Sequence, residues 1–540
     1  MSARARRLWA LAAVGSSVGL GLSFWPSGPY LLIWICLVPH LLLAREASGV
    51  QAVFGAWGLG VVSWVIAVYW FVPIIGNYIP SSPAIQWTLF GLLCIYHGLV
   101  FVVAILLMLI AAKRLRVLGI DHDGAVALAS VPAIVFAEAY FPKLFPGSAA
   151  LTQADHLPAI QCLELGGMAA IAWIITTVNA FVFLGIRALT SDQPSRRRAA
   201  ACFGAALAIW GANELYGHLR IRAVDRAQAN ALAEDRAVSV LVMQPNIAKR
   251  KRIDYARYDR NNEIHSAVTD AGLKNGAVDL VLWPHNTYRR RIYFEADDPD
   301  LKHPRIDGLS AEDAFRRDIP QAAHVLVGAE ADVRDASGVT LKRYFVGLLK
   351  GPDGEYLGAA AKRFPTPLLD FVPFGNIFPF LNRLLPYAYK IAAGPQPVLS
   401  LQNGVRIGIF ICYDTGVAAA ARDLTAAGAQ ILVNPTSDQW SMDKKIQPLQ
   451  HLRFAVIRAV ASRRVLVRAT SSAISAAIDP TGRVVGRMRI DERGSFRVRV
   501  PLMDGIAPAV RLGEWPYRVA GLLLIGFCAA PLFLNRRRGN

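Results

Sequence analysis

The chain has 540 residues, of which 54% are hydrophobic and only 18% are charged, against about 25% charged residues in an average soluble protein. This composition excludes a disordered chain, since the sequence is rich in Trp, Phe and Tyr, and it argues against a single water-soluble globule. The excess of 58 basic over 39 acidic residues gives a net charge of +19. Such a charge is typical of nucleic-acid binding, of contact with an anionic membrane, or of membrane topology signals.

Long apolar stretches dominate the first 220 residues of the chain. A membrane-spanning helix needs about 20 mostly apolar residues to cross about 30 Å of hydrocarbon. About seven candidates occur in this region, and an eighth lies near the C-terminal end. In chain order they are Leu8–Phe24, Tyr30–Leu43, Val53–Ile75, Ile85–Ala112, Gly124–Phe141, Gly166–Ile186, Ala199–Leu215 and Val519–Leu534. We predict a helical membrane domain over residues 1–220 and a transmembrane helix with a basic tail over residues 511–540.

Basic residues cluster at alternate ends of these candidate spans. The clusters include Arg4, Arg6 and Arg7 before the first span, Lys113, Arg114 and Arg116 after the fourth, Arg196, Arg197 and Arg198 after the sixth, and Arg536, Arg537 and Arg538 after the last. If every candidate crosses the membrane, all of these clusters fall on one side, which the positive-inside rule assigns to the cytoplasm. We therefore expect cytoplasmic termini, and we expect no nucleic-acid partner.

Residues 221–510 differ from their flanks, because charged residues return and short apolar runs alternate with helical patterns. The runs are typical of strands that are buried on both faces, and the alternation indicates a layered α/β fold with a mixed sheet. Predicted strands are Ala237–Met243, Val278–Trp283, His324–Gly328, Tyr344–Leu349, Val405–Ile411, Ile431–Asn434 and Val465–Thr470, and Ile446–Ser462 is a predicted helix.

Cys412 is the single cysteine of this α/β block. It follows the apolar run Val405–Ile411 and precedes the Ala-rich stretch Gly416–Ala421. A strand, a sharp turn and a helix would place the thiol at a helix N-terminus, where a thiolate is stabilised. A buried structural cysteine at a strand end is the alternative. No Cys or His residues have the spacing of zinc ligands, and we expect no metal or organic cofactor.

A series of short motifs in this block resembles the carbon–nitrogen hydrolase (nitrilase) superfamily and, within it, the apolipoprotein N-acyltransferases. The resemblance extends to the flanking membrane helices and so covers essentially the whole chain. The motifs occur in family order: Gln244-Pro245-Asn246-Ile247, Trp283-Pro284, Lys362, Val372-Pro373-Phe374-Gly375, Ile411-Cys412-Tyr413-Asp414, Asn434 to Trp440, Gln450-His451-Leu452, Arg458-Ala459 and Ile478-Asp479-Pro480.

The resemblance implies a nitrilase-like α-β-β-α sandwich over residues 221–510, on the periplasmic side of a bacterial inner membrane. The family uses a Glu–Lys–Cys triad, in which the thiolate forms a thioester with an acyl group. By the matching motifs, Cys412 is the nucleophile, and Lys362 and the backbone N–H of Tyr413 hold the oxyanion. The implied acyl donor is a phospholipid, and the implied acceptor is the N-terminal amine of a lipoprotein diacylglyceryl-cysteine.

Several positions depart from the family pattern. His285 stands in place of the triad Glu, Asn376 in place of the loop Glu, and Asp414 in place of the Glu after Cys-Tyr. The segment Pro365–Asp370 is a predicted insertion that separates Lys362 from its motif. A neutral His285 can accept a thiol proton, and we expect an unpaired Lys362 ammonium to keep this imidazole neutral and to favour the thiolate.

Supporting or substrate-binding roles are predicted for Asp414, Asn376, Trp440 and Asp438, which lie in or beside the same motifs. Two other functions stay open at this point. One is a membrane-tethered amidase, in which water replaces the acceptor amine. The other is a catalytically degenerate membrane protein that keeps the nitrilase fold without its chemistry.

Overall fold

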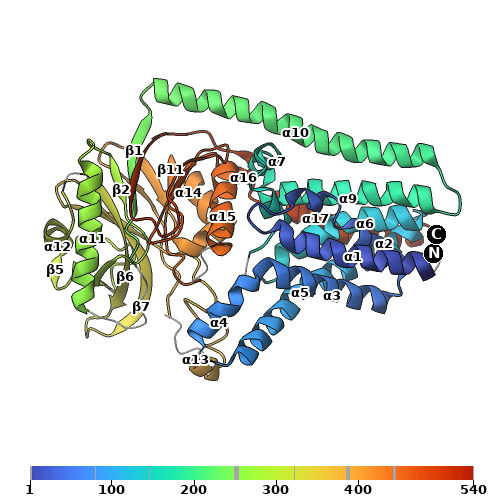
Figure 1. Cartoon of the computed structure of the whole chain (residues 1–540), viewed down its shortest axis with the longest axis horizontal. Coiled ribbons are helices and arrows are strands. Elements are labelled where there is room, and N and C mark those ends of the chain that lie inside the picture. The colour runs from blue at the N-terminus through green and yellow to red at the C-terminus, as the bar shows by residue number, and fades with distance from the viewer. Residues whose placement is uncertain are drawn as a thin grey trace. The chain divides into compact units, whose positions relative to one another are not determined.

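The chain forms two compact units in a computed structural model that describes residues 3–79, 81–144, 146–247, 255–321, 323–384, 390–441 and 445–538. The first unit combines Met1–Ile221 with Leu512–Asn540, and the second is Arg222–Arg511. Figure 1 draws the helices of the first unit and the two sheets of the second, coloured by residue number from blue at the N-terminus to red at the C-terminus.

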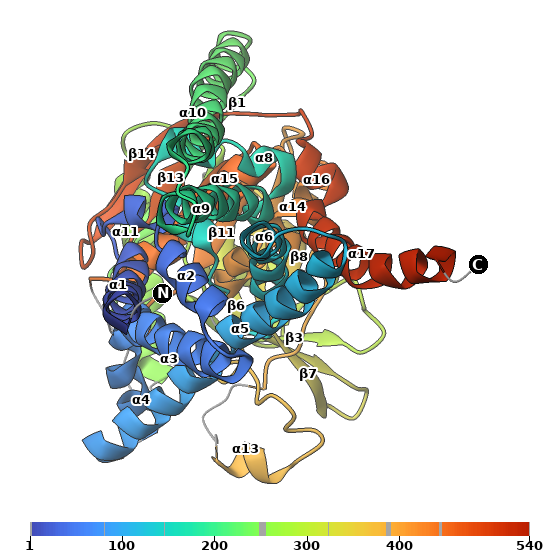
Figure 2. The same ribbon diagram turned by 90° about the vertical axis from the view of Figure 1, so that its right-hand side faces the viewer.

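The described part of the first unit is helical. Its α-helices are α1 (Ala3–Ser23), α2 (Val38–Glu46), α3 (Gly49–Val68), α4 (Val72–Tyr78), α5 (Pro83–Val117), α6 (His122–Tyr140), α7 (Leu157–Ile160), α8 (Leu163–Gly166), α9 (Met168–Thr190), the first part of α10 (Arg196–Ala233), and α17 (Trp515–Arg538). Short 3₁₀ helices occur at Tyr30–Trp34, Tyr69–Phe71 and Ala149–Gln153. Helix α6 packs against α5, α9 and α17, as Figure 2 shows.

Four helical stretches in the described residues are long and apolar enough to cross a bilayer. They are Gly49–Tyr78, Pro83–Val117, His122–Tyr140 and Met168–Thr190, and each overlaps a predicted span. Leu8–Ser23 and Trp515–Ala530 are shorter apolar helices, which also overlap predicted spans. The prediction of about seven spans before residue 220 goes beyond these four and stays a prediction.

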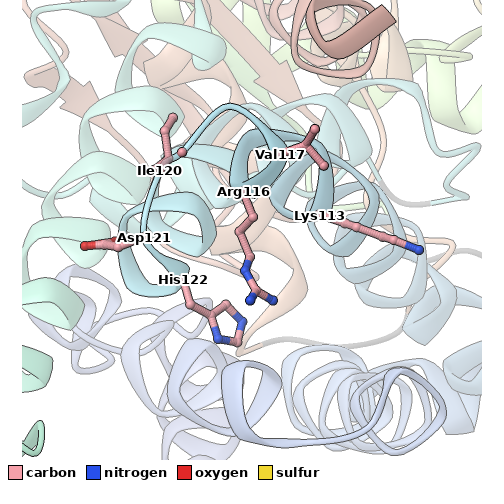
Figure 3. A pocket seen from close by; sticks show the side chains of 7 residues that line it. Lys113, Arg116, Val117, Ile120, Asp121 and His122 are labelled. Atoms are coloured by element: carbon pink, nitrogen blue, oxygen red, sulfur yellow. The ribbon is translucent and has the colours of Figure 1, made fainter. Parts of the chain in front are cut away.

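The turn between α5 and α6 gathers basic side chains. Lys113 and Arg116 lie near the end of α5, and Asp121 caps α6 by accepting a hydrogen bond from the backbone N–H of Gly124 at 2.5 Å. With His122 these residues line an open pocket, in which Figure 3 shows the Arg116 and His122 side chains close together. The pocket contains none of the predicted catalytic residues, so it is separate from the site described below.

Two sheets build the second unit. The nine-stranded sheet contains β1 (Ala237–Gln244), β2 (Leu280–Leu282), β3 (Tyr288–Glu295), β4 (Arg305–Ile306), β5 (Leu309–Ser310), β6 (His324–Arg334), β7 (Thr340–Lys350), β8 (Tyr356–Ala361) and β15 (Gly494–Pro501). The six-stranded sheet contains β9 (Val398–Ser400), β10 (Arg406–Ile409), β11 (Ile431–Thr436), β12 (Val465–Thr470), β13 (Ala476–Ile478) and β14 (Val484–Arg487). Strands β1, β2 and β6 run parallel, as do β10, β11 and β12.

Helices cover the outer faces of both sheets (Figure 1). Helices α11 (Tyr255–Leu273) and α12 (Ala311–Asp318) lie on the nine-stranded sheet, and α14 (Ala418–Ala426) and α15 (Gln447–Ser462) lie on the six-stranded sheet. The short helices α13 (Phe380–Leu384) and α16 (Pro508–Leu512) lie outside these layers. Between the sheets, residues such as Val240, Ile409 and Val433 form a fully buried apolar core.

These four layers confirm the predicted α-β-β-α sandwich, and the helices of the first unit confirm the predicted helical bundle. Every predicted strand forms, and predicted helix Ile446–Ser462 is α15 within one residue. The strands succeed as predictions because their apolar runs are buried on both faces, as in the fully buried β11 and β12. Strand β14 was not predicted, since its mostly exposed residues lack an apolar run.

Candidate active site

The predicted catalytic residues converge where loops leave the ends of strands in both sheets. Cys412 follows β10, His285 follows β2 and Lys362 follows β8. The two sheets are joined here by a hydrogen bond from the backbone N–H of His285 to the carbonyl oxygen of Thr436, at 3.3 Å. The Lys362 ammonium interacts electrostatically with the Cys412 thiol. Carboxyl ends of parallel strands are a common position for ligand sites in α/β folds.

Cys412 begins a short 3₁₀ helix, η4 (Cys412–Gly416), and the first α-helix after it is α14. The thiol therefore lies at the N-terminus of a helix, as the sequence suggested, but this helix is a single 3₁₀ turn and α14 begins only at Ala418. Cys412 has a φ angle of +52°, which is uncommon for a residue with a side chain. The residue is 8% exposed, and its thiol donates a long hydrogen bond to the carbonyl oxygen of Ser437, with a sulfur–oxygen distance of 3.9 Å.

Asp414 ties the cysteine turn to the segment that follows Lys362. Its fully buried carboxylate accepts hydrogen bonds from the backbone N–H groups of Ile411 at 3.0 Å and Phe364 at 2.8 Å, and from Gln396 Nε2 at 3.1 Å. Burial raises the pKa of Asp414 to about 6, while Lys362 and the backbone donors oppose that shift. This carboxylate therefore fixes the position of the thiol relative to the lysine, in line with its predicted supporting role.

Lys362 forms a buried ion pair. Its ammonium donates hydrogen bonds to Asp370 Oδ2 at 2.5 Å and to Thr366 Oγ1 at 2.9 Å. The two charged residues are only 1% and 5% exposed. The prediction that the Lys362 ammonium is unpaired is therefore wrong. Its partner carboxylate belongs to the segment Pro365–Asp370, which separates Lys362 from its motif. Burial disfavours the charged lysine, but its attraction to Asp370 and Cys412 leaves the pKa of Lys362 raised overall.

The segment that carries Asp370 is held by its own backbone. Asp370 Oδ2 also accepts from the backbone N–H of Thr366 at 2.7 Å, and the Asp370 N–H donates to the Thr366 carbonyl at 2.8 Å. The carbonyl oxygen of Asp370 accepts a further hydrogen bond from the N–H of Ile391 at 2.7 Å. These contacts fix the carboxylate in place independently of its ion pair.

His285 lies in an apolar environment beside this ion pair. Its ring packs edge-on against Phe345, with centroids 4.5 Å apart, and the Lys362 ammonium lies 5.8 Å from the same phenyl ring. Neither ring nitrogen has a hydrogen-bond partner among the described residues. Burial, and then the charge of Lys362, lower the pKa of His285 to about 3. The imidazole is therefore neutral at physiological pH, as predicted.

Asp438 forms a second buried network, next in sequence to the Ser437 carbonyl that contacts the Cys412 thiol. Its carboxylate accepts hydrogen bonds from His451 Nδ1 at 2.5 Å, Arg468 Nη2 at 2.5 Å and Gln447 Nε2 at 3.3 Å. Burial opposes ionisation of Asp438, but the attraction of His451 and Arg468 holds its pKa below the usual range. Since Ser437 precedes Asp438, this network positions the carbonyl group that contacts the thiol.

The other predicted site residues have less central positions. Tyr413 follows the nucleophile in η4, and burial raises the pKa of its phenol to about 12. Asn376 is exposed in the loop after Val372-Pro373-Phe374-Gly375, and Trp440 is half-buried in the turn after β11. The described residues contain no group of three His, Cys, Asp or Glu side chains that could hold a metal ion.

Asp370 is the functional candidate that sequence reasoning did not assign. A signal for it exists, because Asp370 is the only acidic residue between Lys362 and Asn376. A buried lysine needs a counter-charge, and with His285 at the family's Glu position no carboxylate is available there. That requirement, applied to the inserted segment, would have identified Asp370.

Comparison with known protein families matches two separate segments of the chain, one in each of the two units. Residues 16–181 match the apolipoprotein N-acyltransferase N-terminal domain, and residues 264–503 match the carbon-nitrogen hydrolase family. The chain therefore combines a segment similar to the apolipoprotein N-acyltransferase N-terminal domain with a segment similar to the carbon-nitrogen hydrolases. These two matches, with the four apolar helices, support a membrane-bound acyltransferase.

Two curated relatives match nearly the full length of the chain, and a third matches about half of it. The apolipoprotein N-acyltransferase of Geobacter metallireducens is 26% identical over 93% of this chain and 91% of its own. That of Pseudomonas putida is 26% identical over 96% of this chain and 95% of its own. That of Azotobacter vinelandii is 31% identical over 49% of this chain and 47% of its own.

Proposed function

We propose that the protein is an N-acyltransferase that moves an acyl chain from a phospholipid, through a thioester on Cys412, to the N-terminal amine of a lipoprotein diacylglyceryl-cysteine. The observation that carries the proposal is the buried Lys362 ammonium, which interacts electrostatically with Cys412 in a chain that resembles N-acyltransferases over most of its length. The substrates are inferred from the names of the relatives.

In the first step the Cys412 sulfur attacks the acyl carbonyl carbon, and the carbonyl oxygen becomes an oxyanion. The Lys362 ammonium is the charged donor for this oxyanion, and the backbone N–H of Tyr413 is proposed as the second. The tetrahedral species collapses to a thioester as the bond to the lysophospholipid oxygen breaks and that oxygen takes a proton. In the second step the lipoprotein amine attacks the thioester carbon, and the thiol is restored.

A proton acceptor for the thiol is also required. The sequence assigns this role to His285, and its neutral ring with two open nitrogens is compatible with accepting a proton. A pKa of about 3 makes it a weak base near neutral pH, however, since the most effective general bases have a pKa close to the working pH. Asp414, Asp438, Trp440 and Asn376 keep their proposed supporting or substrate-binding roles around the nucleophile.

The proposal also includes an orientation in the membrane. We propose that the chain is a multi-pass protein of a bacterial inner membrane with a membrane domain over residues 1–220, a periplasmic catalytic domain over residues 221–510 and a final span within residues 511–540. Reporter fusions ending at residues 117, 235 and 540 test it. The expected result is a periplasmic signal only at residue 235, and a cytoplasmic signal there would refute the orientation.

Trapping the acyl-enzyme tests the reaction. The purified full-length protein is incubated with a phospholipid that carries a fluorescent acyl chain, and the Cys412 peptide is examined by mass spectrometry. We expect an acyl adduct on wild type that hydroxylamine releases, because a thioester is labile to this nucleophile. If wild type carries no more adduct than Cys412→Ala, the thioester mechanism is wrong.

Complementation distinguishes this function from the two alternatives. A bacterial strain depleted of its own N-acyltransferase should regain growth and triacylated lipoproteins when it expresses the wild-type chain, and not when it expresses Cys412→Ala. Release of free fatty acid or ammonia without acyl transfer would instead indicate a hydrolase. Neither activity, in a protein that is correctly inserted, would indicate a degenerate site.

A further inference from the structure

The sequence pattern of the family has a carboxylate after Trp-Pro, but in this chain the carboxylate that bonds to Lys362 is Asp370. The Trp283-Pro284 motif is followed by His285, whose ring is neutral and packs on Phe345 without a hydrogen-bond partner in the described chain. Asp370, by contrast, is bonded directly to the Lys362 ammonium. The negative charge of the site therefore comes from the segment after Lys362.

The position of Asp370 suits proton transfer as well as charge balance. The Lys362 ammonium bonds directly to Asp370 at 2.5 Å, and it also interacts electrostatically with Cys412, so its charge acts on both groups. The Lys362–Asp370 contact of 2.5 Å is a charge-assisted hydrogen bond, along which a proton can move. Because both residues are almost fully buried, water does not compete strongly for this contact.

The rest of the environment favours Asp370 over His285 as the acceptor. Asp370 receives two hydrogen bonds on Oδ2, from Lys362 and from the N–H of Thr366, which fix the carboxylate in one orientation. His285 has no donor or acceptor among the described residues that would orient its ring for proton transfer. A neutral ring held by apolar packing acts as a spacer beside the Lys362–Asp370 pair.

We propose that Asp370 is the final acceptor of the Cys412 proton and that His285 takes no part in proton transfer; this rests on the proposed acyltransferase function. As the S–C bond to the acyl carbon forms, the S–H bond breaks and its proton passes to Lys362. Lys362 simultaneously gives one of its protons to the Asp370 carboxylate and so keeps its positive charge. The proton returns by the same route to the lysophospholipid oxygen when the C–O bond breaks.

Thiol alkylation tests the coupling of Asp370 to Cys412 without any acyl substrate. The full-length protein in detergent is treated with iodoacetamide between pH 5 and pH 10, and alkylation of the Cys412 peptide is followed by mass spectrometry. Asp370→Asn removes a negative charge near the thiol and also removes the counter-charge of the buried Lys362 ammonium. If Asp370 is coupled to the thiol, the alkylation midpoint should shift by about one pH unit or more, to lower pH where Lys362 stays charged and to higher pH where Lys362 loses its proton.

Asp423→Asn is the matched control for this measurement. Asp423 forms an ion pair at 2.8 Å with Arg363, the residue that follows Lys362. Asp423 is partly exposed, and among the described residues the Lys362 ammonium bonds to Asp370 and Thr366 and not to Asp423. Its removal should leave the alkylation midpoint unchanged. If Asp370→Asn also leaves the midpoint unchanged, Asp370 is not coupled to the thiol and the proposal is wrong.

Acyl-adduct formation tests the proton transfer itself. Asp370→Asn should slow formation of the Cys412 adduct by at least about 100-fold, which is the lower range for loss of a general base. His285→Gln should stay within a few-fold of wild type. In the double variant Asp370→Asn/His285→Glu, a carboxylate returns to the family position, and the rate should recover to within about tenfold of wild type.

The outcomes separate the two proposals. If wild type forms no adduct, the acyltransferase function fails, while the alkylation midpoints still decide whether Asp370 is coupled to Cys412. If His285→Gln loses the adduct and Asp370→Asn keeps it, His285 is the base and the present assignment is overturned. If Asp370→Asn alone aggregates, the double variant is measured instead, and a folded double variant with no more adduct than Cys412→Ala would refute the proposal.

Discussion

Two histidines near Cys412 have opposite environments. His451 donates to the Asp438 carboxylate at 2.5 Å and lies 3.1 Å from an Arg468 nitrogen, in a network of charges. His285 has the position of a triad residue in sequence, yet its ring contacts a phenyl group and no hydrogen-bond partner within the described residues. An Asp–His pair is a frequent catalytic arrangement, but here Arg468 and Gln447 bind the same carboxylate, which favours a structural role. The place of a histidine in a motif therefore does not show by itself which groups its ring contacts.

The largest effect should come from breaking the network around His451. Asp438→Ala leaves the buried Arg468 guanidinium without its carboxylate, and loss of one partner of a buried ion pair typically costs about 3–5 kcal/mol. We expect a strong decrease in the thermal midpoint of the purified protein. Asp423→Asn, which breaks a partly exposed pair, should change the midpoint little. Equal midpoints for both variants would contradict the structural role of this network.

The position of His285 can be disturbed without changing its side chain. A Cβ atom at Gly328 would lie 2.5 Å from the carbonyl oxygen of Pro284 and 2.6 Å from the Cα atom of His285, so the backbone must shift. Gly328→Ala should destabilise the protein by about 1–3 kcal/mol, as overpacking does in other cores. Gly338→Ala is not a suitable control, because the positive φ of Gly338 adds strain of its own.

Gly204 in α10 is the better control for this substitution, because a Cβ atom added there would have no neighbouring atom within 4 Å among the described residues. Gly204→Ala should keep or slightly raise the thermal midpoint, since alanine favours a helix. A Gly328→Ala variant as stable as Gly204→Ala would show that the Pro284–His285 backbone lies further from β6 than these distances indicate.

Acid stability provides a third test of the comparison. The pKa of His285 is lowered to about 3 in the folded protein, so below its unfolded value of about 6.5 the unfolded chain takes up a proton that the folded chain does not. This residue therefore removes stability as the pH falls from about 6.5 toward 3, by about 1.4 kcal/mol for each pH unit. The free energy of unfolding of His285→Gln, measured relative to wild type, should therefore be about 1.4 kcal/mol higher at pH 5.5 than at pH 8.

Urea denaturation at the two pH values measures this gain, with the tryptophan fluorescence of the protein as the signal. His303→Gln is the control, because His303 is exposed. The same difference from wild type at both pH values for His285→Gln would mean that the imidazole is solvated or paired, and the contrast with His451 would disappear.

The smallest effect is expected for His451→Gln. The glutamine amide can still donate a hydrogen bond to Asp438, and Arg468 and Gln447 continue to hold the carboxylate. We expect a loss below about 1 kcal/mol, within the range of a single weakened hydrogen bond, and an unchanged rate of Cys412 acylation. A much slower acylation with normal stability would indicate that the Asp438–His451 pair takes part in catalysis.

Much of this fold could be predicted because its signals are local. The apolar runs of β11 and β12, the motif around Cys412 and the long apolar helices each identify their own structure. The contact between Lys362 and Asp370 could not be predicted in this way, because it depends on how the segment between them turns. Helix α12 was also missed, since its short polar sequence buries only Ala311, Ala314 and Phe315.

The candidate site was likewise predicted only in part. Cys412, Lys362 and His285 were selected by their motifs, and in the structure Lys362 interacts electrostatically with each of the other two residues. The expected free charge on Lys362 was wrong, because Asp370 in the inserted segment supplies the counter-charge that His285 does not provide. The 3₁₀ turn at Cys412 was also not foreseen, since its positive φ angle depends on the hydrogen bonds that Asp414 and Thr415 provide.

The Lys362–Asp370 ion pair is contained in one short stretch of sequence. Its two charges, the Thr366 hydroxyl and the turn that joins them all lie within residues 362–370. Such a segment can be exchanged between related proteins if the groups that hold its backbone, here Ile391 and Asp414, are present as well. Loop grafting into a relative that keeps a glutamate after Trp-Pro would create a site with two carboxylates and one lysine. Like-charge repulsion in such a chimera would raise the pKa of one carboxyl group and make it a proton donor.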